Sequence, residues 1–203
     1  MKKLLISGFD GHMGQETARL APDYGFDAQP FSVGESGDVI IDFSHPDCLN
    51  ALLESGIPLV IGTTGYTQAQ QRRILEAATL RPIFQAANFS PGVYALGAAA
   101  KAVKALLPDW DISLIERHHA RKLDHPSGTA LRLAQSVEAN QVLSVRAGTV
   151  RGIHELAFYG PEESVFFIHT AESRAAFAHG ALRAAKWLLE QENGLYGMEH
   201  LIR

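Results

Sequence analysis

The residues with the greatest potential for chemistry in this 203-residue chain lie in one short segment, Glu116–Ala130. Its first ten residues include three histidines, two arginines and a lysine, although the whole protein has a formal charge of −4. Concentrated positive charge attracts a small anion, and a lysine beside histidines can donate a proton when its pKa is lowered. Ser127 is suited to cap the helix that follows, and the N–H groups of Gly128 and Thr129 could then bind a carboxylate. The segment therefore predicts a site that binds an anion and transfers a proton.

The residues of this segment, taken alone, allow other interpretations. A run of charged residues often forms only a solvated surface. Histidine pairs suggest a metal, but His118 and His119 are adjacent and would point apart on a strand, unlike the i, i+4 pair of a zincin helix. Cys48 is the single cysteine, and no neighbouring residue would activate it as a nucleophile. We therefore expect no metal site and no covalent catalysis.

A second segment with chemical potential is the glycine-rich loop near the N-terminus. Gly8, Gly11 and Gly14 follow an apolar run and precede residues at helical spacing. Glycine lets the backbone approach a pyrophosphate closely, and a helix N-terminus adds N–H donors and partial positive charge. The spacing is G-x-x-G-x-x-G rather than the commoner G-x-G-x-x-G, so an ordinary turn is the alternative. The strand–loop–helix context favours a dinucleotide.

Two further loops of small residues follow expected strands. Gly62–Gly65 comes after Pro58–Ile61, and Ala86–Gly92 comes after Pro82–Gln85. Ligands of open α/β sheets bind beyond the carboxyl ends of the strands. Each loop alone could be a tight turn, but three such loops on one edge of a sheet favour a ligand site.

The elements that must position these loops follow two patterns. We expect strands at 4–7, 39–43, 58–61, 82–85, 111–116, 142–146, 153–159 and 165–170, and helices at 11–20, 46–54, 67–78, 91–107, 127–137 and 174–190. The early alternation of strands and helices predicts right-handed βαβ units and a parallel sheet covered on both faces. The later strands follow one another at short intervals, which predicts antiparallel pairing.

The expected fold class is therefore α/β, with two domains. A Rossmann-type parallel-sheet domain would span 1–106, and the tail from about 183 to 203 is a candidate to return to it. A smaller α+β domain with an open mixed sheet, for substrate binding and oligomerisation, would span 107–182.

Composition excludes several classes of protein. Hydrophobic residues make up 46% of the chain and charged residues 20%, which is typical of a globular protein and not of a disordered one. The slightly acidic balance gives no general attraction to nucleic acid or to an anionic membrane. No apolar run is long enough to span a membrane, and the run after Lys3 is too short for a signal peptide. We therefore expect a cytoplasmic protein without a disulfide framework.

In order along the chain, five motifs resemble those of the dihydrodipicolinate reductase family: G-x-x-G-x-M-G, D-F-S, G-T-T-G, A-A-N-F-S-x-G and H-H-x-x-K-x-D-x-P-S-G-T-A. In this family NADH or NADPH reduces a cyclic intermediate of bacterial diaminopimelate and lysine synthesis. Further matches at 145–148, 152–154, 168–169, 173–174 and 177–181 extend the resemblance over nearly the whole chain. The last motif is far more specific than the glycine loop.

The resemblance implies a role for each matched residue. His118 and Lys122 match the catalytic pair, and the residues expected at the carboxylates of a small dicarboxylate substrate are His119, Ser127, Gly128 and Thr129. Gly8–Met13 would bind the pyrophosphate of NADH or NADPH, while the loops after 61 and 85 would border the nicotinamide. The full set of expected cofactor residues is Gly8, Phe9, Asp10, Gly11, His12, Met13, Phe43, Gly62, Thr63, Thr64, Ala86, Ala87, Asn88 and Phe89.

The chain departs from the family pattern in two places. Residues 21–37 form a shorter segment than the family usually has, with 28–32 as the only candidate second strand and no acid or arginine directly after it. Residues 137–142 are also shortened, in the domain through which family members commonly form tetramers. We expect a homo-oligomer, a tetramer by resemblance. Two other functions stay open: a dinucleotide-binding protein without turnover, and a nicotinamide-dependent reductase of another small dicarboxylic acid.

Overall fold

The computed structural model describes residues 1–202 and divides the chain into two compact units. Unit 1 is Met1–Phe89 together with the segment that begins at Ala175, and unit 2 is Ser90–Arg174. This division differs from the expected boundary at 106 for one helix, α4 (Pro91–Leu106), because α4 packs against α5 (Gly128–Val137) and β9 (Ser164–Thr170) of unit 2. The chain also returns to unit 1 earlier than expected.

Unit 1 contains six parallel strands in the order β10-β5-β4-β3-β1-β2. The strands are β1 (Lys2–Ser7), β2 (Phe26–Pro30), β3 (Val39–Asp42), β4 (Leu59–Ile61), β5 (Pro82–Gln85) and β10 (Gly194–Tyr196). The helices are α1 (His12–Leu20), η1 (Ala21–Tyr24), η2 (Pro46–Cys48), α2 (Leu49–Glu54), α3 (Gln68–Ala78), α6 (Ala175–Leu188) and α7 (Met198–Leu201). The predicted parallel sheet is confirmed, and the short segment after α1 still forms the second strand.

Helices cover both faces of this sheet, which explains why its central strands are apolar throughout. Ile83 of β5 packs in a cluster with residues of α2 and α3. The next residue, Phe84, contacts Trp187 of α6 edge-on, with ring centroids 6.2 Å apart. Successive side chains of a strand point to opposite faces, so α6 lies on the face opposite α2 and α3.

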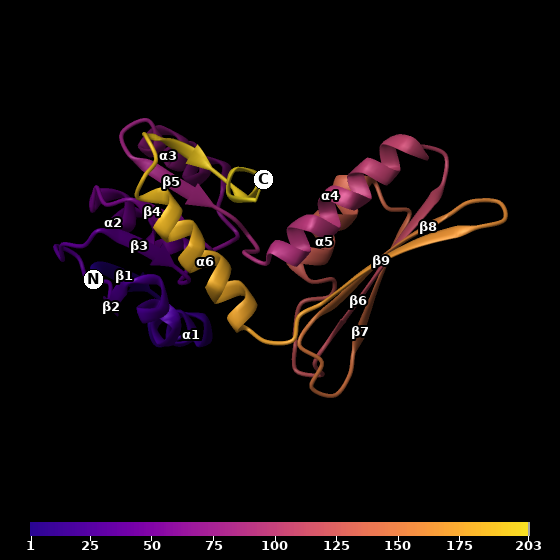
Figure 1. Ribbon diagram of the computed structural model, residues 1–203, viewed down its shortest axis with the longest axis horizontal. Helices are drawn as coiled ribbons and strands as arrows, with labels where there is room; N and C mark the ends of the chain where they lie inside the picture. Colours follow the sequence, from indigo (N-terminus) through magenta and orange to yellow (C-terminus); the bar gives the residue numbers. More distant parts are fainter. Residues whose placement is uncertain (203) are drawn as a thin grey trace. The chain divides into compact units, whose positions relative to one another are not determined.

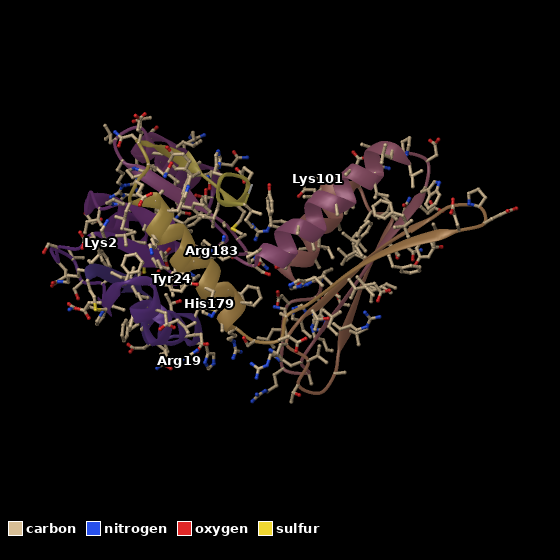
Figure 2. The ribbon with its side chains drawn as sticks, in the orientation of Figure 1. Lys2, Arg19, Tyr24, Lys101, His179 and Arg183 are labelled. Atoms are coloured by element: carbon tan, nitrogen blue, oxygen red, sulfur yellow. The ribbon has the colours of Figure 1, made fainter. Side chains whose placement is uncertain are left out.

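The C-terminal segment completes unit 1. Figure 1 shows α6 lying along the sheet of unit 1, and its contacts include α1 and the central strands. Figure 2 shows Tyr24 of η1 beside His179 of α6, and the Tyr24 hydroxyl lies 3.0 Å from His179 Nδ1. α6 therefore packs against elements from the first quarter of the chain.

Unit 2 is a mixed sheet in the order β7-β6-β8-β9, with α4 and α5 on one face. Its strands are β6 (Asp111–His118), β7 (Gln141–Arg146), β8 (Ile153–Tyr159) and β9 (Ser164–Thr170). The expected antiparallel pairing holds for β6 with β8 and for β8 with β9, but β7 pairs parallel with β6. The reason is that α5 acts as a crossover between β6 and β7, and a helical crossover returns the chain in the same direction.

Within residues 1–202, no helix is long and apolar enough to cross a membrane.

Candidate active site

A cleft of about 580 Å³ in unit 1 brings together the loops that follow β1, β3 and β4. It is lined by Gly11, His12, Met13, Phe43, Ser44, His45, Pro46, Gly62, Thr63, Thr64 and Gly65. Seven of the expected cofactor residues are in this lining: Gly11, His12, Met13, Phe43, Gly62, Thr63 and Thr64. The three loops follow the carboxyl ends of adjacent parallel strands, where open α/β sheets bind their ligands.

Glycine is required by packing at two positions of the β1–α1 turn. A Cβ on Gly8, which has a φ of +81°, would lie 2.4 Å from the carbonyl oxygen of Phe43. A Cβ on Gly14 would lie 2.2 Å from the carbonyl oxygen of Gly8, so α1 can approach the turn only with glycine there. Gly11 is the N-cap of α1, no side chain caps the helix, and the cleft opens at this end. This arrangement fits an anion at the helix N-terminus. Phe9 and Asp10 lie in the same turn, outside the lining of the cleft.

A buried carboxylate, Asp42, holds two of the loops together. One of its oxygens accepts hydrogen bonds from the backbone and hydroxyl of Ser44, and the other accepts from the hydroxyl of Tyr66 at 3.2 Å. The Thr63 hydroxyl accepts a further bond from the backbone N–H of Ser44 at 3.0 Å. Burial and the charge of Asp42 raise the pKa of Tyr66, which keeps its hydroxyl a donor. Thr63 was expected from the sequence, whereas Asp42, Ser44 and Tyr66 were given no role, although Asp42 and Ser44 belong to the D-F-S motif.

The loop after β5 contributes an aromatic wall. Phe89 is buried, stacks on Phe84 with centroids 6.0 Å apart, and meets Phe43 edge-on at 5.9 Å. A Cβ on Gly62 would lie 2.3 Å from the Phe43 ring and 3.0 Å from the Phe89 ring. The structure thus brings the expected residues Phe43, Gly62 and Phe89 together. It places Ala86, Ala87 and Asn88 after β5, outside the lining of the cleft.

In unit 2, the end of β6 and the loop after it carry the expected catalytic residues. His118 is the last residue of β6, and its Nδ1 is hydrogen-bonded to the buried carboxylate of Glu116. Lys122 lies in the following loop, where its Nζ is 2.7 Å from a carboxylate oxygen of Asp124. The backbone N–H of Lys122 donates to the carbonyl of His119 at 3.1 Å, which makes the loop a tight turn.

The start of α5 is where substrate carboxylates were expected to bind. The Ser127 side chain caps the helix by accepting a hydrogen bond from the N–H of Ala130 at 3.2 Å. Its backbone N–H donates to Glu116 at 3.3 Å, and its hydroxyl lies 3.5 Å from His154 Nε2. Gly128 and Thr129 form the first turn, as the sequence predicted.

Burial controls the protonation of this region. It raises the pKa of Glu116, but hydrogen bonds from Arg146 and His118 outweigh that effect and hold the pKa at about 2. It lowers the pKa of His118, and the neighbouring Glu116 charge only partly offsets this. It also lowers the pKa of His154 to about 4, with further repulsion from His118 and His169. Near neutral pH the site therefore holds an ionised Glu116 beside neutral His118 and His154.

Four residues of this region lie in segments singled out from the sequence but were given no role there: Glu116, Arg146, His154 and His169. The signal that could have found Glu116 is its position in β6, where it continues the alternation of Ile112 and Leu114 toward the core. A carboxylate at a core position requires partners. Within residues 1–202, no group of His, Cys, Asp or Glu side chains could hold a metal ion.

Comparison with known proteins gives matches in both halves of the chain. The protein-family model for the N-terminus of dihydrodipicolinate reductase matches residues 23–89, and the family model for its C-terminus matches residues 92–202. The 4-hydroxy-tetrahydrodipicolinate reductase of Caldanaerobacter subterraneus subsp. tengcongensis is 36% identical over 250 aligned positions, covering 100% of this chain and 99% of that protein. The enzyme of the same name from Wolinella succinogenes is 43% identical over 194 aligned positions, covering 81% of this chain and 76% of that protein.

Among solved structures, the dipicolinate-bound dihydrodipicolinate reductase of Paenisporosarcina sp. TG-14 has a similar fold. Its TM-score is 0.81 at 23% identity, over 98% of this chain and 99% of that chain. The Caldanaerobacter alignment is longer than the 203 residues of this chain, so that relative contains segments that this chain lacks.

Proposed function

Because the chain belongs to the dihydrodipicolinate reductase family, we propose that it reduces 4-hydroxy-tetrahydrodipicolinate to tetrahydrodipicolinate with NADH or NADPH. It is an NAD(P)H-dependent oxidoreductase of diaminopimelate and lysine biosynthesis. The observation that carries this function is that one chain holds both required parts. Unit 1 has the glycine-lined cleft, and unit 2 has His118, Lys122 and the capped turn at Ser127.

The residues of unit 1 fit a nicotinamide dinucleotide, because the start of α1 at Gly11 has no side-chain cap and lies in the lining of the cleft, together with the loops after β3 and β4. Gly11, His12 and Met13 would hold the pyrophosphate against the start of α1. Gly62–Thr64 and the ring of Phe89 would border the nicotinamide. When bound, NADH or NADPH supplies the hydride.

The residues of unit 2 would orient the substrate and supply the proton. His119 and the first turn of α5, at Gly128 and Thr129, would bind the carboxylates, and orientation of this kind contributes to the rate. Burial keeps His118 neutral near pH 7, as its lowered pKa indicates. We therefore assign Lys122 as the proton donor and place His118 beside it at the reacting atoms.

Two other functions compete with this one and are separable by experiment. A binding protein without turnover would take up NADH or NADPH and oxidise neither. A reductase of another dicarboxylic acid would oxidise the cofactor with that acid and not with 4-hydroxy-tetrahydrodipicolinate. A panel of small dicarboxylates, each assayed for cofactor oxidation and for product by mass spectrometry, tests both. Turnover confined to 4-hydroxy-tetrahydrodipicolinate supports the proposal, and a preference for another acid contradicts it.

We also propose that the protein is a cytoplasmic homotetramer. The face of the unit 2 sheet opposite α4 and α5 carries a row of side chains that are register neighbours: Leu143, Ile115, Glu155 and Ile168. Leu143, Phe166 and Ile168 of this open face are 51%, 53% and 62% exposed. Large apolar side chains gathered on one sheet face are typical of an interface between subunits.

A further inference from the structure

Glu116 occupies a position that the fold of unit 2 would ordinarily give to an apolar residue. It lies on the same face of β6 as Ile112 and Leu114, which pack under α4 and α5, and it is 0% exposed. Burying a carboxylate costs several kcal/mol unless it is fully hydrogen-bonded or paired. A charge without partners at such a position would lower the stability of the fold substantially. The groups that contact Glu116 therefore indicate what this charge does.

Both carboxylate oxygens of Glu116 are bonded to residues of the proposed substrate site or its support. One accepts from His118 Nδ1. The other accepts from the guanidinium of Arg146 at 2.6 Å and from the backbone N–H of Ser127 at 3.3 Å. Arg146 also donates to the backbone carbonyl of Asp124, the residue whose carboxylate pairs with Lys122. One buried group thus contacts the end of β6, the start of α5 and, through Arg146, the loop between them.

The bond to His118 determines which ring nitrogen carries the proton. An ionised carboxylate only accepts hydrogen bonds, so His118 Nδ1 must be the N–H donor, and in the neutral ring Nε2 has the lone pair. Nε2 faces Gly152, where a Cβ would lie 3.1 Å away. A side chain at residue 152 would crowd this nitrogen, whereas glycine leaves room beside it.

We propose that Glu116 is a positioning residue, which fixes the tautomer and the direction of His118 and joins His118 to the turn of Ser127 that binds a substrate carboxylate. Its effect on turnover rests on the proposed reductase function. Its effect on the tautomer does not, because the tautomer is a property of the folded protein.

The substitution Glu116→Gln tests this with little change of shape. The glutamine carbonyl can still accept from Arg146 and Ser127, but its amide group donates, so His118 Nδ1 must become an acceptor and Nε2 must carry the proton. We expect kcat to fall about 100-fold, in the range of proton-transfer groups, while the Kd for NADPH, which binds unit 1, changes less than two-fold. A purely structural role would be rescued by glutamine.

The direct readout is the nitrogen spectrum of the full chain labelled with ¹⁵N-histidine, with His118 assigned by its loss in His118→Asn. The wild type should show Nδ1–H at His118, and Glu116→Gln should show Nε2–H. The exposed Glu162, in the β8–β9 turn of the same unit, is the control: Glu162→Gln should keep the wild-type tautomer and kcat.

The proposal is overturned if wild-type His118 carries its proton on Nε2, or if Glu116→Gln keeps the wild-type kcat. The wild-type spectrum alone tests the tautomer of His118, even if Glu116→Gln does not fold. Absence of turnover in the wild type would contradict the reductase function and leave the tautomer result standing.

Discussion

His118 and Arg146 are register partners on the neighbouring parallel strands β6 and β7, and both side chains reach the same buried carboxylate, that of Glu116. The arginine side chain is itself only 8% exposed. Two buried charges of opposite sign are tolerable together, whereas one alone is not. Arg146 therefore keeps Glu116 ionised, and the ionised Glu116 holds His118.

Removing the arginine should consequently destabilise unit 2. Arg146→Met leaves the charge of Glu116 buried without its main partner, so we expect the free energy of unfolding to fall by about 3 kcal/mol. Urea unfolding followed by fluorescence measures this. The double variant Glu116→Gln, Arg146→Met should regain part of the loss, because no unpaired charge remains. Equal stability of the single and double variants would contradict the pairing.

Lys122→Ala should abolish turnover while sparing cofactor binding. The substitution removes the proposed proton donor from unit 2, whereas the cleft proposed to bind NADH or NADPH lies in unit 1. We expect kcat to fall by at least about 100-fold, with an unchanged Kd for NADPH by fluorescence titration. Equal loss of activity and cofactor affinity would contradict the role assigned to Lys122.

The buried histidine His154 should make the protein sensitive to mild acid. The titratable groups around it are Glu116, Lys122, His118 and His169, and its pKa of about 4 lies below the ordinary 6.5 chiefly because of burial. In the unfolded chain this histidine therefore binds a proton near pH 6.5, whereas in the folded chain it binds one only near pH 4. Stability from this group is complete above pH 6.5 and is lost as the pH falls toward 4, by up to about 3 kcal/mol.

The measurement is the free energy of unfolding against pH for the wild type and for His154→Phe, which removes the titrating group. The variant should show a smaller slope between pH 6.5 and pH 4. His118 and His169 also have lowered pKa values, so a residual slope of the same sign remains. Identical slopes would show that His154 does not titrate in this range.

The open face of the unit 2 sheet should determine assembly. Phe166→Glu with Ile168→Lys would place charges at two of its most exposed apolar positions, and we expect a tetramer to dissociate into smaller species by light scattering after size exclusion. Leu80→Glu is the matched control, because Leu80 is 80% exposed in unit 1, outside this face. Dissociation by the control alone, or a wild-type monomer, would contradict the proposal.

Local pattern predicted most of the fold, since apolar strands and glycine loops are read within a few residues. The positions of β1, β3, β4 and β5 followed from such runs. The place of β7 did not, because pairing with β6 rather than β8 depends on how the α5 crossover packs. The start of unit 2 differs from the expected boundary for a related reason. The helical spacing of α4 shows that this helix has a buried face, but it does not show which sheet covers that face.

The candidate site divides in the same way. His118, Lys122 and Ser127 belong to one continuous motif and could be found from sequence. Glu116 and Arg146 are 30 residues apart, and their contact exists only because β6 and β7 are neighbours. Likewise the Asp42 carboxylate joins Ser44 to Tyr66 across two loops. Supporting contacts of this kind depend on tertiary structure, so a single sequence does not reveal them.

The most direct test of the proposed function is steady-state oxidation of NADH and of NADPH, in parallel, with freshly generated 4-hydroxy-tetrahydrodipicolinate. We expect turnover with at least one cofactor. The ratio of the two kcat/KM values would show whether a protein with a shortened segment after α1 prefers NADH or NADPH. No turnover with either cofactor, while both still bind, would contradict the account and favour a dinucleotide-binding protein or a reductase of another acid.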